Sequence, residues 1–202
     1  TALAQPGVID GAALYLGNVQ LRHQSQEFTF RVLALDPEKT GFLTPALQSK
    51  ARVLTLPDVA MIDLRTRGMD PEFLAGIRPQ TPLRTEITGH RISFVDNFVG
   101  GVGFAEDGYM ITSDQTMMHL FPRRHTSAPN HILLKVAAGH PVEQVVAHLH
   151  DVLPDNLRIR TLDQAADEDV SYQTTERPTG LIFGFGVVMG ILVGIVIVYQ
   201  VL

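Results

Sequence analysis

Eight His residues are the side chains that most readily suggest chemistry, because a neutral imidazole can bind a metal or transfer a proton. Three of them, His140, His148 and His150, lie close together in the chain. On a helix, His148 and His150 would project about 200° apart, so they could not share a metal ion as residues four apart can. We therefore expect structural or surface roles for them and no metal site.

Carboxylates and hydroxyls give no stronger signal. The acidic run Asp163, Asp167, Glu168 and Asp169 lacks the turn glycine and the ligand order of a calcium loop, and acids at a helix start stabilise the helix instead. No Ser lies in a G-x-S-x-G nucleophile motif. We expect no catalytic residues.

Glycines and net charge exclude further classes. No segment matches the phosphate-binding pattern G-x-x-x-x-G-K-[ST], and the cluster Gly100, Gly101 and Gly103 is too short for a dinucleotide fingerprint, so it favours a flexible loop. We expect no cofactor, and any ATPase would be a separate polypeptide. The 16 Lys and Arg against 21 Asp and Glu give a net charge of -5, and there is no Cys. These values argue against nucleic-acid binding, disulfides and Cys-ligated zinc.

All charged residues lie at or before Arg177, and the stretch 181–202 has Gln200 as its one clearly polar member. As a helix, this stretch would be about 33 Å long, enough to cross a hydrocarbon core of about 30 Å. The sequence therefore predicts an extracytoplasmic domain over 1–177 and a transmembrane helix over 178–202. Because the chain starts at Thr1 and stops at the edge of this stretch, we expect it to be part of a longer protein.

Glycines recur every four residues within the apolar stretch. Gly186, Gly190 and Gly194 would fall on one face of the helix, where small residues let two membrane helices approach closely. We predict that these three residues pack against another membrane helix.

The polar part predicts a mixed domain, α+β in class, whose first two thirds are mostly β. Alternating or β-branched runs predict the strands, and a helical period between Pro141 and Pro154 predicts an amphipathic helix. Thr88, Gly89 and His90 mark a hairpin turn, and Asp107, Gly108 and Tyr109 a tight turn. The expected strands are 14–22, 28–35, 59–64, 85–95 (a hairpin), 110–112, 132–138 and 157–162.

Two further helices complete the expected pattern. One begins at Ser113 or Asp114, either of which can cap it, and ends before Pro122. The other, 163–175, leads toward the apolar stretch, so domain and span are expected to be mechanically continuous. The segment 132–162 is expected to form a β-α-β unit in a small α+β layer.

Several of these segments resemble one family. LPDVAMIDLRTR (56–67), TEITGHRISFVDNFVGGVGFAEDGYMITSDQTMMHLFP (85–122) and PTGLIFGFGVVMGILVGIVIVYQVL (178–202) resemble the DevC-type permease of heterocyst-envelope ABC exporters, within the FtsX-like and MacB-like permease group. FAEDGYMITSD (104–114) and GIVIVYQVL (194–202) are the most specific parts. The resemblance implies a MacB-like periplasmic core in two subdomains, followed by the second of four membrane helices.

The resemblance also implies a function and partners. It describes an inner-membrane, multi-pass export permease that forms a homodimer and works with a cytoplasmic ABC ATPase subunit. Its periplasmic domain relays motion to a membrane fusion protein and a TolC-like outer-membrane channel, with glycolipid as the implied substrate. Two alternatives stay open: an FtsX-like scaffold that regulates a periplasmic hydrolase, and a membrane-anchored enzyme.

Overall fold

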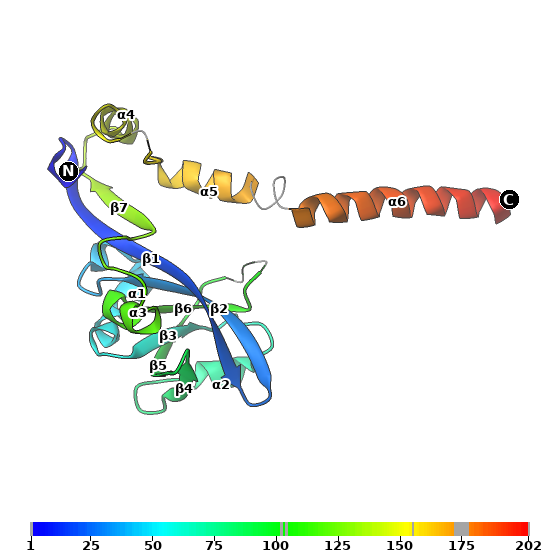
Figure 1. The fold of residues 1–202 in the computed structure, drawn as a ribbon, viewed down its shortest axis with the longest axis horizontal. Coiled ribbons are helices and arrows are strands. Elements are labelled where there is room, and N and C mark those ends of the chain that lie inside the picture. The colour runs from blue at the N-terminus through cyan, green and yellow to red at the C-terminus, as the bar shows by residue number, and fades with distance from the viewer. Residues whose placement is uncertain (1, 102, 104, 155, 172–177, 202) are drawn as a thin grey trace. The chain divides into compact units, whose positions relative to one another are not determined.

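The strands of this protein form one mixed sheet. The computed structural model describes residues 2–101, 103, 105–154, 156–171 and 178–201, and within these ranges it has seven strands (Figure 1). Their bounds are β1 Val8–His23, β2 Gln26–Leu35, β3 Val59–Asp63, β4 Leu83–Ile87, β5 His90–Phe98, β6 Gly108–Ser113 and β7 His131–Val136. Six of the seven predicted strands are thereby confirmed.

Non-local pairing sets the order β4-β5-β3-β6-β2-β1-β7. β1 and β2 form an antiparallel hairpin, whereas β2 pairs with β6 and β3 pairs with β5 in parallel. The centre of the sheet is antiparallel, where Met61 of β3 faces Ile111 of β6. β1 also packs against β4, so the twisted sheet coils around its core.

Turn and cap residues fix the local geometry where the sequence predicted it. Thr88 and Gly89 have φ of 51° and 83° and connect β4 to β5, as a two-residue hairpin with two left-handed positions requires. Helix α3, Asp114–Leu120, begins where Ser113 Oγ accepts a hydrogen bond from the Thr116 amide at 3.2 Å. This capping bond stabilises a helix start by about 1 kcal/mol.

Two apolar clusters lie on opposite faces of the sheet, because successive strand residues point to opposite sides. Ala60, Ile62 and Met110 belong to the larger cluster, which α3 covers with Met117 and Leu120. The intervening residues belong to the smaller cluster, which comprises Leu35, Leu54, Met61, Phe98 and Ile111. Short helical segments connect the strands: η1 Ala2–Ala4, η2 Thr40–Phe42, α1 Pro45–Gln48, η3 Ala51–Thr55 and α2 Pro71–Ala75.

The chain divides into two compact units. One is Val8–Lys135, which holds nearly the whole sheet, and the other joins Thr1–Gly7 to Val136–Leu202. The second unit contains α4 Val142–Val152, α5 Leu162–Ser171 and α6 Pro178–Val201. The predicted helix between Pro141 and Pro154 is therefore confirmed as α4, with Pro141 at its cap.

The predicted strand 157–162 is wrong, and with it the β-α-β unit over 132–162. Residues 156–161 form no ladder within the described chain, and Leu162 already begins α5. Alternation of apolar residues with Arg158 and Arg160 resembles a strand, but a strand also needs a neighbour for its backbone groups. Both arginines instead approach the Glu168 carboxylate of α5, Arg158 at 3.8 Å.

The predicted helix 163–175 corresponds to α5 up to Ser171, and its last four residues lie outside the described part of the chain. Within the residues that the structure describes, no helix combines the length and the apolar character needed to cross a membrane. The predicted span over 178–202 extends to Leu202, which is outside that description, and it stays a prediction.

Candidate functional site

Charged side chains gather at one edge of the sheet, around the glycine-rich loop 99–107. The parallel strands β3 and β5 both end at this edge, with Asp63 and Phe98, and the antiparallel β6 begins there with Gly108 (Figure 1). The loop therefore leaves β5 and returns as β6 on the far side of β3. We call loop 99–107 and the side chains that hold it the loop clamp.

Asp63 holds the start of the loop. Its side chain is fully buried, and its Oδ1 atom accepts hydrogen bonds from the amides of Arg65 and Gly100, both at 3.0 Å. Its Oδ2 atom is buried without a hydrogen-bond partner among the described residues. Since buried polar atoms are normally paired, this carboxylate is held at a cost to the fold.

Asp107 holds the end of the loop. Its amide donates to the Thr29 carbonyl at 2.8 Å, and its Oδ2 accepts from the Thr29 amide at 2.8 Å. Its carbonyl accepts from the Arg67 amide at 2.7 Å. The expected tight turn at 107–109 is therefore wrong, because Gly108 and Tyr109 are already in β6 and Asp107 extends its contact with β2.

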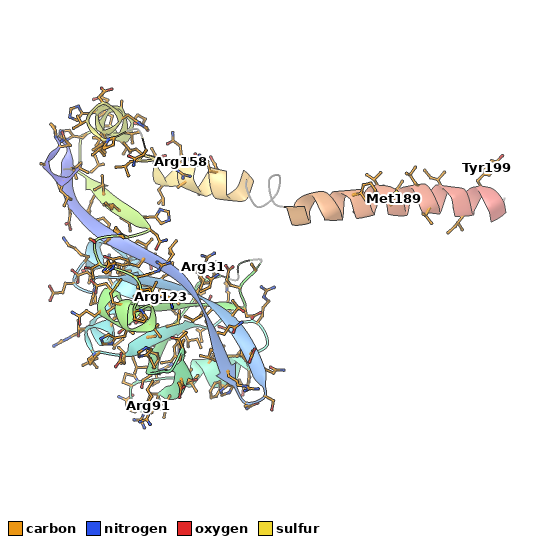
Figure 2. All side chains as sticks on the ribbon, viewed as in Figure 1. Arg31, Arg91, Arg123, Arg158, Met189 and Tyr199 are labelled. Carbon is orange, nitrogen blue, oxygen red and sulfur yellow. The ribbon has the colours of Figure 1, made fainter. Side chains whose placement is uncertain are left out.

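An ion pair closes the clamp. Arg31 of β2, labelled in Figure 2, donates from Nη2 to Oε1 of Glu106 at 2.7 Å, and the Glu106 side chain is 8% exposed. Arg67 donates to the carbonyls of Gly103, at 2.9 Å, and Glu106. These contacts join β2, the segment after β3 and the loop itself.

Close packing explains two of the loop glycines. A Cβ at Gly100 would lie 2.8 Å from Asp63 Oδ2, and one at Gly103 would lie 2.5 Å from Glu106 Oε2. A Cβ at Gly101 would meet nothing within 4 Å. The segment is a loop, as the sequence predicted, but it is anchored at both ends; residues 102 and 104 lie outside the described chain.

The contacts of the clamp suit a role in positioning loop 99–107 better than a role in catalysis. The carboxylates of Asp63, Glu106 and Asp107 accept from backbone amides and arginines, which positions a loop and leaves them poorly placed to take a proton from a substrate. The loop presents Val99, which is 65% exposed. Asp63 is not among the functional candidates expected from the sequence. The one local signal was a carboxylate directly after four apolar strand residues.

The glycines predicted to pack between membrane helices lie on α6. A Cβ at Gly186, Gly190 or Gly194 would meet no heavy atom within 4 Å. Beside Gly194 an open apolar groove is lined by Ile191, Ile195, Val198 and Tyr199. A second helix could approach closely along this face. The structure contains one chain, so helix packing stays a prediction.

The histidines considered as ligands, His140, His148 and His150, belong to the compact unit that contains α4, whereas the clamp belongs to Val8–Lys135. His148 Nε2 is 3.0 Å from Gln5 Oε1, and the His140 ring lies beside Gly7. Among the described residues, no group of three or more His, Asp or Glu side chains could hold a metal ion.

Among the described residues, the surroundings shift the pKa of Asp10, Tyr15 and Lys39. The hydrogen bond from Lys39, at 2.6 Å, lowers the pKa of the half-buried Asp10 carboxyl, and the same bond raises the pKa of Lys39. Burial, and then the charge of Asp114, raises the pKa of Tyr15. The Tyr15 hydroxyl donates to the Thr126 carbonyl at 2.6 Å, so the neutral phenol is the form that fits the fold.

Solved structures provide a comparison for the fold. No family model matches the chain, and no curated protein matches it in sequence. The extracellular domain of the noncanonic ABC-type transporter YknZ from Gram-positive bacteria is 8% identical, with a TM-score of 0.52, over 79% of this chain and 85% of that domain. The periplasmic region of MacB from Actinobacillus actinomycetemcomitans is 10% identical, with a TM-score of 0.44, over 74% and 70%. The likeness to the YknZ extracellular domain confirms the α+β fold class and shows that this chain shares the fold of that domain.

Proposed function

We propose that this chain is part of a permease subunit of an ABC-type transporter, with 1–177 outside the cytoplasm and 178–202 crossing the membrane. The observation that carries the proposal is the fold shared with the YknZ extracellular domain, in a chain whose last 25 residues are free of charge. In this proposal the domain and the membrane helix belong to a subunit that has no catalytic site of its own. ATP hydrolysis belongs to a separate subunit.

The finer proposal is that the system is a DevC-type exporter in a cell inner membrane. In this proposal the periplasmic domain relays ATP-driven motion to a membrane fusion protein and a TolC-like channel, and two copies of the permease form a homodimer. The loop clamp supports it, because a relay needs a surface loop whose displacement is passed to the sheet. Asp63 and Asp107 connect loop 99–107 directly to β3 and β2. Glycolipid is the proposed substrate class.

Membrane insertion is the first test. Membranes from cells that express the chain are extracted with alkaline carbonate, and we expect the chain to stay in the pellet until detergent is added. Val188 and Ile191 are both exposed on α6, so we replace both with Arg, at a cost of about 3 kcal/mol each for insertion. The double variant should move to the soluble fraction, whereas the double Leu variant should not. Release of the unaltered chain by carbonate alone would refute the span.

Transport is the second test. The parent permease, its ATPase and its fusion protein are reconstituted, and a permease without Val8–Lys135 is compared with the intact one. We expect the deletion to abolish fusion-protein binding and export while ATPase binding remains. Equal export by both would contradict the proposal. The alternative scaffold function predicts a periplasmic hydrolase in the purified complex in place of the fusion protein.

A further inference from the structure

The segment that includes most of α3 and the chain that follows it has an unusual charge distribution. From Gln115 to Val142 the sequence contains no Asp or Glu, although it has Arg123, Arg124, Lys135 and four of the eight His residues. The whole chain has a net charge of -5, so this stretch is opposite in sign to the rest. Its centre is loop 121–130, between α3 and β7, which we call the arginine loop.

The arginine loop is held in place by hydrogen bonds to β1. The Asn130 amide donates to the Leu14 carbonyl at 3.0 Å, and Asn130 Oδ1 accepts from the Leu16 amide at 2.8 Å. Tyr15 reaches the middle of the loop through its bond to the Thr126 carbonyl. A preorganised loop loses little conformational entropy when it binds a partner.

Its two arginines differ in their contacts. Arg124 lies with its guanidinium 5.4 Å from the centre of the Phe121 ring and donates to Asn130 Oδ1 at 2.8 Å. Arg123, labelled in Figure 2, follows α3 and is exposed, as is His125. Arg124 donates to Asn130 with one of its five N–H groups and Arg123 is exposed, so both guanidinium groups can donate to a carboxylate.

None of the ion pairs among the described residues includes an arginine of this loop. Arg31 and Lys50 pair with carboxylates of the same domain, and His119, just before the loop, pairs with Asp58. Neither Arg123 nor Arg124 forms an ion pair among the described residues, whose ion pairs involve other cations. Their guanidinium groups are therefore available to a negatively charged group of a partner.

We propose that the arginine loop is a docking surface for an acidic segment of a protein partner, a site that does not depend on the transporter assignment. Arginine binds carboxylates in a planar, two-bond geometry that gives specificity. A lipid surface fits less well, because two arginines strengthen binding to an anionic membrane only about fivefold each. Membrane-binding loops also expose aromatic rings, whereas Phe121 packs against Gly17 of β1.

The test measures binding of a defined acidic peptide to the full chain in a neutral detergent. The probe is a fluorescein-labelled peptide of roughly twelve residues in which Glu and Gly alternate, compared with its Gln counterpart. Anisotropy is read at about 20 mM and about 300 mM NaCl. We compare Arg123→Glu with Arg91→Glu, since Arg91 is an exposed residue of β5 that undergoes the same charge change (Figure 2).

We expect the Glu peptide to bind at low salt and the Gln peptide not to bind. Arg123→Glu should weaken binding at least tenfold, Arg123→Gln several-fold, and Arg91→Glu less than twofold. Failure of the unaltered chain to bind the Glu peptide would overturn the proposal, as would equal losses in Arg123→Glu and Arg91→Glu. Stronger binding to phosphatidylglycerol vesicles, lost in Arg123→Glu, would overturn the choice of a protein partner. Circular dichroism verifies that each variant is folded.

Discussion

Replacement of Asp63 tests whether the loop clamp depends on one carboxylate. In Asp63→Ala the amides of Arg65 and Gly100 both lose their acceptor, which is the buried Oδ1 atom 3.0 Å from each. A hydrogen bond to a charged group contributes about 1.5–3 kcal/mol, so two bonds contribute about 3–6 kcal/mol. Removal of the buried, unpartnered Oδ2 returns about 1–3 kcal/mol. Taking the middle of each range, the net loss of unfolding free energy should be about 2–3 kcal/mol.

Asp63→Asn is the matched control. Its carbonyl oxygen can still accept from both amides, and a neutral side chain no longer carries the cost of a buried charge. The bonds lose their charge assistance, which makes them roughly half as strong. Since these effects oppose one another, we expect Asp63→Asn to change the unfolding free energy by less than about 1 kcal/mol.

Two measurements compare the variants. Urea unfolding in mild detergent, followed by circular dichroism, gives the change in unfolding free energy. Hydrogen exchange detected by mass spectrometry reports on 58–66 and on the loop, where a 2 kcal/mol loss corresponds to about 30-fold faster exchange. If Asp63→Ala and Asp63→Asn had equal stability, or if exchange in the loop were unchanged, the carboxylate would not hold the loop.

Three further predictions address the clamp, the buried phenol and the proposed relay. Gly100→Ala should lower the unfolding free energy by about 1–3 kcal/mol, because its Cβ would meet Asp63 Oδ2 at 2.8 Å, whereas Gly101→Ala should have little effect in the same urea titration. Burial raises the pKa of Tyr15 in the folded state above its ordinary value of 10.0. The neutral phenol therefore stabilises the fold fully below about pH 10, and this contribution is lost as the pH rises from about 10 through the folded-state pKa. Tyr15→Phe should flatten the fall in unfolding free energy measured between about pH 9 and 11. A flexible Gly-rich insertion after Arg177 should abolish export without preventing assembly, and undiminished export would contradict the relay.

Local elements could be predicted because their signals are local. The hairpin at Thr88 and Gly89 and the Ser113 cap each follow from a few adjacent residues with strong backbone or capping preferences. The strand expected over 157–162 failed because alternation is necessary for a half-buried strand but does not supply a neighbouring strand. The apolar stretch 178–202 follows from composition alone.

The candidate site could not be predicted in this way, because its contacts join distant parts of the chain. Gly100 lies 37 residues from Asp63, and Glu106 lies 75 residues from Arg31. Which of these residues meet depends on the parallel pairing of β3 with β5 and of β2 with β6. Parallel pairing leaves no signal in a short stretch of sequence.

The sequence by itself determined the existence of six strands, of the helices capped at Ser113 and Pro141, of the Thr88–Gly89 hairpin and of the charge-free stretch, since each depends on side-chain periodicity or on the backbone preferences of neighbouring residues. Only the tertiary structure decided the strand order, and with it the burial of Asp63 against Gly100 and the anchoring of the arginine loop on β1. The physical reason is register. Strand register places residues from separate segments opposite one another, and it is settled by packing of the whole core.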